Sequence, residues 1–478
     1  MPLRRTKIIA TLGPSTDDSV MLKRIIEAGV DLVRLNFSHG KAEDHAKRLH
    51  QAREAAASLD KEIAVMADLQ GPKIRIARFK NKQICLHEGD TFTLDASLAD
   101  DVGDEQQVGI DYKELPHDLH VNDILLLDDG RLVFKVKELI GNKIICDVQV
   151  GGVLSNNKGI NRLGGGLSAK ALTDKDREDL KTAVSLGVDY VAISFPRSAA
   201  DINEARELLN KENSKAGIVA KIERAEAVHA LDEIIKASDA VMVARGDLGV
   251  EIGDAELPAV QKHIIQRART LDKAVITATQ MMESMIHNAI PTRAEVFDVA
   301  NAVIDGTDAV MLSAETATGE HPAKVVEAMA RICLGAERQK RTQISGHRVE
   351  CHFTRVDEAI AMAAMYTANH LNIKAIIALT ESGSTPLWMS RIRSGIPIYG
   401  LSRNIDTQRR MTLYRGVYPV NFNVTSYPFD QVNKMAITEL KKHHIVETGD
   451  WVIITRGDLI GVHGKTNEMK IIQVDSDK

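Results

Sequence analysis

Short apolar runs that end in a charged or hydroxyl residue recur along this chain. Eight of them alternate with amphipathic helical stretches, at residues 8–11, 32–36, 64–68, 190–194, 218–223, 240–245, 274–279 and 309–313. Near-continuous apolar strands that alternate with helices are typical of a parallel sheet buried on both faces. Eight of them predict an α/β fold with a closed (β/α)8 TIM barrel, whose active site lies where the strands end.

The pattern changes twice along the chain. Between residues 72 and 169, short alternating runs separated by turn signals replace the helical periodicity and predict an inserted all-β domain. An insertion after the third barrel strand emerges over the active site, so we expect it to act as a lid. Near the C-terminus, strand–helix alternation resumes and predicts a doubly wound α/β domain. The expected domains are a catalytic barrel (1–71 and 170–344), a β-barrel lid (72–169) and a C-terminal α/β regulatory domain (345–478).

The composition narrows the class of partner. The chain has 478 residues, a formal net charge of −5 and 4% aromatic residues. This balance argues against nucleic acid and anionic membranes as partners, because neither long-range attraction nor a stacking surface is available. The chain begins without a signal region and has no apolar run long enough to span a bilayer, so a cytoplasmic location is expected. Cys85 and Cys146 lie in apolar runs and are expected to be buried free thiols.

Two neighbouring strand ends carry the strongest chemical signal. Alternation along a strand puts Lys221 and Glu223 on the same side, facing the barrel mouth. Asp247 follows the next strand, and two carboxylates from adjacent strands can bind Mg²⁺ together with substrate oxygens. Lys221 and Arg245 beside them favour an anionic substrate. A structural salt bridge is the simpler interpretation of Lys221 and Glu223 taken alone.

The other strand ends are more ambiguous. Arg34 and Asn36 share a face, and a charged residue near the end of a buried strand needs a partner. Asp68 ends the third strand, and a structural pair between Asp68 and Arg75 is about as plausible as a catalytic role. Thr279 ends the seventh strand, where a lone threonine is usually only a strand former.

A hydroxyl-rich loop stands between a strand and a helix of the last domain. It consists of Thr380, Glu381, Ser382, Gly383, Ser384 and Thr385. An ordinary helix cap is the simpler interpretation. Four hydroxyls in six residues exceed the needs of a cap, however, and favour a pocket for a phosphate group.

With these residues in place, the chain resembles the pyruvate kinase family over essentially its whole length. The matching blocks are residues 35–40, 68–75, 157–161, 218–224, 242–249 and 278–285. The resemblance implies a three-domain subunit, usually a homotetramer, that makes pyruvate and ATP from phosphoenolpyruvate and ADP in the final step of glycolysis. It also implies a phosphorylated effector for the last domain.

The resemblance assigns roles residue by residue. Glu223 and Asp247 would hold the catalytic Mg²⁺, Lys221 would neutralise the phosphoryl group in flight and the developing enolate, and Arg34 would bind phosphate. The substrate carboxylate would bind to three residues, namely Gly246, Asp247 and Thr279. The nucleotide would be reached by Asn36, His39, Arg75 and Lys158. The family's potassium site matches Asn36, Ser38, Asp68 and the carbonyl of Leu69.

Two residues depart from the family pattern. Lys73 stands where many members carry Glu, and we expect its ammonium to reach the neighbourhood of Asp68 and replace the monovalent cation, which makes added K⁺ dispensable. Ser384 stands where the effector loop often carries Arg, so the effector is not identified.

Two other functions fit part of the pattern. A metal-dependent barrel lyase or aldolase acting on 2-oxo acids would share the metal and the cations, but it would leave the lid and Lys158 unexplained. A non-catalytic sensor of phosphorylated metabolites would be expected to have lost Lys221, Glu223, Asp247 or Thr279, and all four are present.

Overall fold

A closed parallel barrel is the centre of the structure, a computed structural model that describes residues 3–344, 351–458 and 464–475. The eight strands follow the order β1-β16-β15-β14-β13-β12-β3-β2. They are β1 (Lys7–Thr11), β2 (Leu32–Asn36), β3 (Ala64–Asp68), β12 (Tyr190–Ile193), β13 (Gly217–Ile222), β14 (Ala240–Ala244), β15 (Ala274–Ala278) and β16 (Ala309–Leu312). The predicted (β/α)8 barrel is confirmed.

Alternation along these strands divides the barrel into two cores. Inward-facing side chains such as Leu32, Met66 and Met242 fill the interior, while their neighbours Val33 and Val65 pack outward against the helices. The surrounding helices are α1 (Ser19–Ala28), α2 (Ala42–Ala57), α4 (Asp174–Ser185), α5 (Ala199–Lys211), α6 (Ala225–His229), α7 (Leu231–Ala237), α8 (Arg245–Ile252), α9 (Leu257–Thr270), α10 (Arg293–Asp305), α11 (Ala314–Ala317) and α12 (Pro322–Glu337). Short 3-10 helices are η1 (Pro14–Thr16), η2 (Glu283–Ile286) and η3 (Lys340–Thr342).

The segment inserted after β3 forms a separate β structure with its own core. A six-stranded sheet has the order β11-β7-β8-β9-β5-β6, and β10 pairs with β4 in a second sheet. The elements are β4 (Gln83–Leu86), β5 (Thr91–Asp95), β6 (Gln107–Gly109), α3 (Leu115–Asp118), β7 (Ile124–Leu127), β8 (Leu132–Ile140), β9 (Lys143–Val150), β10 (Gly152–Ser155) and β11 (Ile160–Arg162).

The expected β-barrel form of the lid stays a prediction. The six-stranded sheet has β11 and β6 at its edges, and residues 75–79 reach both edges through isolated bridges to Gly159 beside β11 and to Ile110 and Gly103 beside β6. The expectation of a buried Cys85 is wrong. Ile84 and Leu86 face the core of this lobe, so alternation turns Cys85 outward, whereas Cys146 is buried.

The C-terminal part is a five-stranded sheet with helices on both faces. Its order is β19-β18-β17-β20-β21, parallel except for the antiparallel edge strand β21. Two apolar clusters, one with α16 and one with α13 and α14, cover opposite faces. The elements are α13 (Val356–His370), β17 (Ile373–Leu379), α14 (Ser384–Arg391), β18 (Ile398–Ser402), α15 (Ile405–Met411), β19 (Val417–Asn421), η4 (Val424–Ser426), α16 (Val432–Lys442), β20 (Trp451–Gly457) and β21 (Thr466–Gln473).

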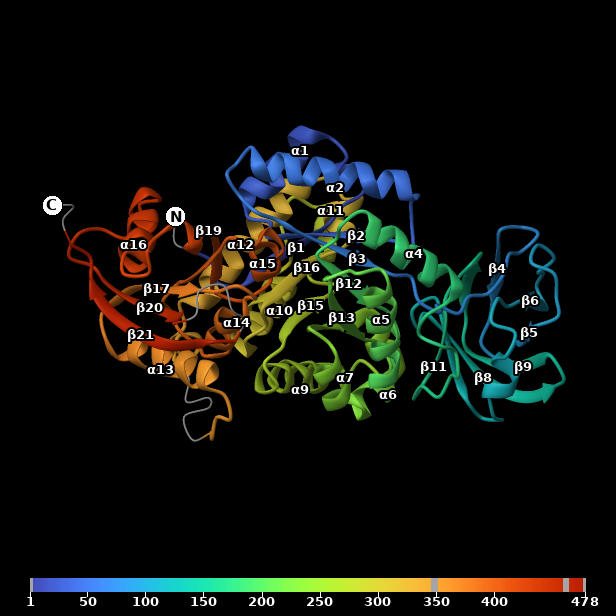
Figure 1. The fold of residues 1–478 in the computed structure, drawn as a ribbon. Helices are drawn as coiled ribbons and strands as arrows, with labels where there is room; N and C mark the ends of the chain where they lie inside the picture. The colour runs from blue at the N-terminus through green and yellow to red at the C-terminus, as the bar shows by residue number, and fades with distance from the viewer. Residues whose placement is uncertain (1–2, 345–350, 459–463, 476–478) are drawn as a thin grey trace.

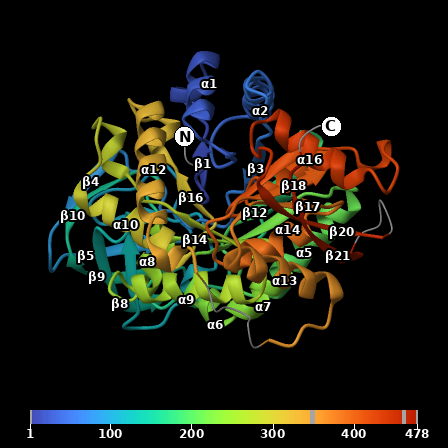
Figure 2. The same cartoon turned by 90° about the vertical axis from the view of Figure 1, so that its left-hand side faces the viewer.

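The three lobes lie in a row, with the barrel in the middle (Figure 1). Viewed from the left-hand side of Figure 1, the C-terminal sheet stands in front of the barrel (Figure 2). It docks on the ends where the barrel strands begin, because Lys7 Nζ at the start of β1 bonds to the carbonyl of Val417, and the hydroxyl of Tyr190 at the start of β12 bonds to the carbonyl of Arg410. The C-terminal domain therefore leaves the opposite end of the barrel, the mouth, open to the lid.

The exact domain boundaries stay a prediction. Residues 345–350, at the predicted start of the C-terminal domain, lie outside the residues that the structure describes. Among the helices that the structure describes, none is both long and apolar enough to cross a membrane.

Candidate active site at the mouth of the barrel

A row of alternating charges crosses the barrel mouth. Arg34 at the end of β2 places Nε 2.6 Å from Oδ2 of Asp68, the last residue of β3. Lys221 on β13 places Nζ 3.2 Å from Oδ1 of Asp68 and 2.9 Å from Oε1 of Glu223. The expected grouping of these four side chains is therefore what the structure has, and the partner of Asp68 is Arg34 rather than Arg75.

Mutual pairing keeps this row ionised although it is buried. Burial by itself would raise the pKa of Asp68, but the charges of Arg34 and Lys221 hold it below its usual value. Burial likewise opposes the charged form of Lys221, yet Asp68 and Glu223 raise its pKa well above the usual value. Lys221 is therefore a permanent cation that faces the space where a substrate would lie.

Glu223 and Asp247 form the candidate metal site. Oε2 of Glu223 accepts a hydrogen bond of 2.9 Å from the backbone N–H of Phe195, which orients the carboxylate. Burial raises the pKa of Glu223, and the negative charge of Asp247 raises it further, although Lys221 opposes both. Carboxylates that disfavour each other's charge are stabilised by a shared cation. Over the described ranges there is no cluster of three or more His, Cys, Asp or Glu suited to a metal, so a metal here would need substrate or water oxygens as further ligands.

Lys73 does not lie where the sequence suggested. Its Nζ is 3.0 Å from Oδ1 of Asp247, and this carboxylate raises its pKa although burial opposes the charge. The chain turns at Gly71 directly after β3, and the turn directs the side chain across the mouth to the start of α8. The expected contact of the ammonium with the Asp68 neighbourhood is thus wrong, because the ammonium lies on the candidate metal ligand.

Thr279 occupies a strained turn at the end of β15. Its φ of +65° is a rare value for a β-branched residue and marks strain. Oγ1 of Thr279 accepts a bond of 2.9 Å from the N–H of Gly246, and Arg245 donates from Nη2 to the carbonyl of Thr279 at 2.6 Å. Arg245 starts helix α8, points away from the mouth and pairs with Asp298, so its expected role in attracting an anionic substrate is corrected to holding this turn.

Ser194 is a site residue that sequence reasoning missed. Its Oγ accepts a bond of 2.7 Å from Nζ of Lys221 and donates one of 2.7 Å to the carbonyl of Leu69. The signal was its place at the end of an apolar run, like the other site residues. The Leu69 carbonyl, a candidate potassium ligand, is therefore already bonded to Ser194.

The remaining candidates lie around the rim. Asn36 Oδ1 accepts from the N–H of Ser38, and His39 is exposed in the turn that follows. Arg75 donates to the carbonyl of Asn157 at 2.9 Å, and Lys158 Nζ is 2.7 Å from Oδ1 of Asp128. Arg75 and Lys158 thus belong to the edge of the lid that faces the barrel.

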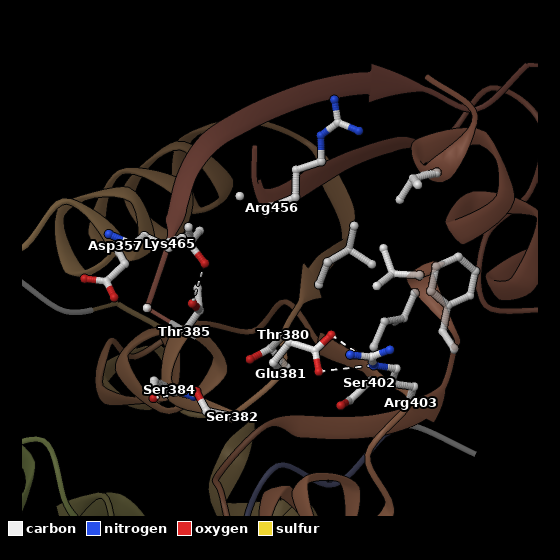
Figure 3. Close-up of a pocket in the computed structure, with 18 of the residues that line it drawn as sticks. Asp357, Thr380, Glu381, Ser382, Ser384, Thr385, Ser402, Arg403, Arg456 and Lys465 are labelled. Atoms are coloured by element: carbon white, nitrogen blue, oxygen red, sulfur yellow. Dashed lines mark hydrogen bonds and ion pairs between the residues drawn. The ribbon is translucent and has the colours of Figure 1, made fainter. Parts of the chain in front are cut away.

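The hydroxyl-rich loop lines a separate pocket in the C-terminal sheet (Figure 3). Gly383, with φ of +82°, stands at the cap position of α14 and supplies no side chain, so the hydroxyls are not used as an ordinary cap. Ser382 and Ser384 bond to each other at 2.9 Å through their Oγ atoms.

Cations that sequence reasoning missed complete this cavity of about 60 Å³, and they are Arg403, Arg456 and Lys465. Arg403 follows β18, Arg456 lies in β20, and Lys465 precedes β21. Because the carboxyl ends of parallel strands meet at one edge of a sheet, β17, β18 and β20 bring the loop and two of these cations together.

Comparison with known proteins gives matches over the whole chain. Residues 3–326 match the family model described as "Pyruvate kinase, barrel domain", and residues 358–472 match "Pyruvate kinase, alpha/beta domain". A pyruvate kinase of Buchnera aphidicola is 56% identical over 476 residues, which cover 99% of both chains. Pyruvate kinase II of Salmonella typhimurium is 56% identical over 477 residues, again 99% of both chains. A pyruvate kinase of Haemophilus influenzae is 56% identical over 459 residues, 95% of this chain and 96% of that one.

Proposed function

This chain belongs to the pyruvate kinase family, and from that premise we propose which of its residues bind the metal, the phosphoenolpyruvate and the nucleotide. The chain is a phosphotransferase of glycolysis, and it depends on a divalent metal as pyruvate kinases do. A barrel lyase or aldolase and a catalytically dead sensor are set aside, because the similarity at 56% identity extends over the full length.

Mg²⁺ is the proposed metal, and Glu223 and Asp247 are its protein ligands. The donor set fits, because the negative charge of the partly exposed Asp247 disfavours ionisation of the buried Glu223, and Mg²⁺ commonly takes one or two carboxylates with substrate oxygens and water. When bound, the ion supplies positive charge to the phosphoryl oxygens. The ammonium of Lys73 has to leave Asp247 before this carboxylate can bind the metal.

Phosphoenolpyruvate is proposed to bind with its phosphate against Arg34 and Lys221. Both are cations at the mouth, and both are held by Asp68. The substrate carboxylate is proposed to lie against Thr279 and the start of α8 at Gly246 and Asp247, where it would take over the backbone N–H of Gly246 that Oγ1 of Thr279 now accepts. The strained turn at Thr279 orients this part of the site before any substrate arrives.

ADP is proposed to bind between the barrel rim and the lid. Arg75 and Lys158 on the lid edge supply positive charge, and Asn36 and His39 on the rim complete the site. Lys158 is paired with Asp128 of the same lid, so the two side chains move with it together.

The chemistry follows from positioned charge rather than from covalent catalysis. Phosphoryl transfer brings several negative charges together and is accelerated by fixed cations in a dry site. Lys221 remains protonated, so it stabilises both the phosphoryl group in transit and the enolate left behind. The enolate must then gain a proton on carbon. Thr279 is too weak an acid to donate it alone, so we propose a water held near its hydroxyl as the donor.

We also propose that added K⁺ is dispensable. Asp68 is already matched by Arg34 and Lys221, and Lys73 brings a further cation onto Asp247. A potassium ion beside Asp68 would therefore meet positive charge that is already in place. The candidate ligands Asn36, Ser38, Asp68 and the Leu69 carbonyl remain the place where K⁺ would bind if it were needed.

Three further proposals concern the whole protein. The pocket at residues 380–385 is proposed to bind a phosphorylated effector, on the strength of its hydroxyls and of Arg403, Arg456 and Lys465. The chain is proposed to form a homotetramer, supported by the exposed apolar side chains of Ile290 and Phe297 at α10. A cytoplasmic location is proposed with its glycolytic role.

A coupled assay of pyruvate formation tests the proposed function. The purified protein should form pyruvate from phosphoenolpyruvate and ADP with Mg²⁺, and chelation should abolish the activity. The rate should change by less than about two-fold when K⁺ replaces a large organic cation at fixed ionic strength. No pyruvate with any divalent metal would refute the function, whereas activation many-fold by K⁺ would refute only the potassium proposal. A Ser382→Ala, Thr385→Ala double variant should lose its response to sugar phosphates and nucleotides, and an unchanged response would contradict the effector pocket.

A further inference from the structure

Arginine side chains from both domains converge on a small cavity where the C-terminal domain docks on the barrel. The cavity has a volume of about 20 Å³, and its walls include Arg5, Arg269, Arg393 and Arg415. Arg5 precedes β1 and Arg269 lies near the end of α9, whereas Arg393 and Arg415 come from the C-terminal domain. We call these four residues and Arg391, which lies beside them, the arginine cluster.

Carboxylates neutralise only two members of this cluster. Arg391 pairs with Asp308, and both side chains are 1% exposed. Arg5 lies 3.6 Å from Glu337 and also bonds to carbonyls of that helix end and of Ser394. Asp305, whose charge also acts on Arg393, is bonded through both oxygens to Lys262.

The other three guanidiniums have no carboxylate within 4 Å among the residues described. Arg269 donates from Nη2 to the carbonyl of Arg391 at 2.8 Å. Arg393 donates to the carbonyls of Ile304, Asp305 and Arg341, and Arg415 donates to those of Val303 and Thr307. Backbone carbonyls accept hydrogen bonds but carry no net charge, so these three half-buried positive charges are not paired with a carboxylate.

The arrangement disfavours the charged form of two of these arginines, whose pKa values are lowered. Burial, together with the charges of Arg393, Arg391 and Arg415, lowers the pKa of Arg269 to about 9, although Asp308 opposes the shift. Burial, Arg5 and Arg393 lower the pKa of Arg415 to about 10 against the charges of Glu337 and Asp308. Like charges that outnumber their counter-ions are stabilised by an external anion.

We propose that a small inorganic anion of the size of chloride binds in this cavity and neutralises the cluster. A cavity of this volume has room for about one water-sized particle, which favours a monatomic anion over phosphate or sulfate. A water molecule fits too, but it carries no charge and accepts only about two hydrogen bonds. A halide accepts from several guanidiniums at once, and each guanidinium has five N–H donors. The anion would link α9 of the barrel to the two arginines of the C-terminal domain.

Bromide is the probe for a direct test. Crystals of the full chain grown in sodium bromide should show an anomalous peak in the cavity within hydrogen-bonding distance of Arg269 and Arg415. A cavity that contains only water, with bromide confined to the surface, would overturn the proposal.

Thermal unfolding gives a second, independent readout in solution. The Tm of the parent should rise with the logarithm of chloride concentration when gluconate keeps the ionic strength constant, because the anion binds only the folded protein. The variant Arg269→Gln should retain about half of that rise or less.

The matched control is Arg267→Gln on the same helix, which breaks a surface pair with Asp232 and leaves the cavity intact. It should respond to chloride like the parent. Equal chloride responses in Arg269→Gln and the control would contradict the proposal. If Arg269→Gln does not fold, Arg393→Gln replaces it in the same comparison.

Discussion

At the scale of single residues, buried charges of opposite sign offset one another at the mouth of the barrel. Lys221 lies between Asp68 and Glu223, and Ser194 fixes its ammonium from a third side. Each carboxylate is therefore ionised because a cation is near, and the cation stays protonated because the carboxylates are near. The consequence is a site with its charges placed before the substrate arrives.

Replacing Lys221 by Met should lower kcat by roughly 10²–10³-fold, which corresponds to a loss of about 3–4 kcal/mol of transition-state stabilisation. Mn²⁺ binding, measured by electron paramagnetic resonance, should persist because Glu223 and Asp247 remain. Lys181→Met, on the exposed face of α4, is the control and should leave kcat unchanged. A rate within a few-fold of the parent would show that Lys221 has only a structural role.

Glu251 makes stability depend on pH. Burial raises its pKa from 4.5 to about 7, although Arg224 and the N–H of Ala225 favour the charged form. The folded state then binds the proton more tightly than the unfolded state. The contribution of this group is fully present below pH 4.5 and is lost as the pH rises to about 7, by up to about 3 kcal/mol.

Glu251→Gln keeps the shape of the side chain and removes the charge. In urea titrations, this variant should lose the part of the pH slope between pH 4.5 and 7 that belongs to Glu251, and it should be more stable than the parent at pH 8. An unchanged slope would mean that Glu251 titrates normally in the folded protein.

The sequence identified the residues that end a barrel strand but not the partner of each side chain. Lys221, Glu223, Asp68 and Arg34 follow from alternation and strand order alone. Lys73 and Arg245 were interpreted wrongly, because a turn and a helix start redirect them and neither has a periodic signal. Ser194 was missed because a single serine at a strand end has no distinctive spacing.

At the scale of elements, the lid is attached through a glycine-rich exit that the barrel holds in place. The N–H of Gly164 bonds to the carbonyl of Glu251, and the N–H of Gly166 bonds to Glu226. Gly165 has φ of +75°, and a Cβ there would lie 2.6 Å from Oε2 of Glu226. Movement of the lid therefore requires a change in this segment, whose positive φ values at Gly164, Gly165 and Gly166 favour glycine.

Gly165→Ala should impair lid closure and lower the rate of pyruvate formation. Its control is Gly89→Ala in the lid itself, where φ is also positive at +91° but no atom lies within 4 Å. Hydrogen exchange at the lid edge should slow in the parent when Mg²⁺, substrate and nucleotide are added. It should slow less in Gly165→Ala, and Gly89→Ala should behave like the parent. Equal protection in all three proteins, with or without ligands, would argue against a moving lid.

Element prediction succeeded where periodicity carries the information, but periodicity does not determine which distant strands pair. The eight barrel strands are confirmed because burial on both faces produces continuous apolar runs. The sequence predicted the β structure of the lid, but alternation shows only which residues face the core and not which strands pair with each other. Isolated bridges at Arg75, Ile76 and Phe79 depend on which distant strands meet.

At the scale of the whole molecule, the barrel serves a different partner at each end. The lid lies at the mouth, and the C-terminal domain docks on the opposite end (Figure 1). Arg391 and Asp308 form a buried ion pair at this junction. Breaking that pair would leave an uncompensated buried charge, which is strongly destabilising. A signal from the proposed effector pocket would have to cross this junction to reach the residues at the mouth.

A second copy of the chain is expected to cover α10. Phe297 is 70% exposed and Ile290 in the preceding loop is 74% exposed, which is unfavourable unless another surface covers them. Phe297→Glu should reduce the assembly from tetramer to smaller species in light scattering. Val20→Glu, at another exposed apolar residue on α1, is the control and should leave the assembly unchanged. A Phe297→Glu protein of parental mass would exclude α10 from the interface.

The ammonium of Lys73 on Asp247 would compete with the metal that we propose for this carboxylate. An ion would have to displace a lysine held on the same chain, so its observed affinity would be the difference between two attractions rather than the strength of one. At low metal concentration the lysine would stay on Asp247 and offset the repulsion between Asp247 and Glu223. Once displaced, the ammonium would be free to face the phosphates of the nucleotide, so binding of the metal and of the nucleotide would be coupled.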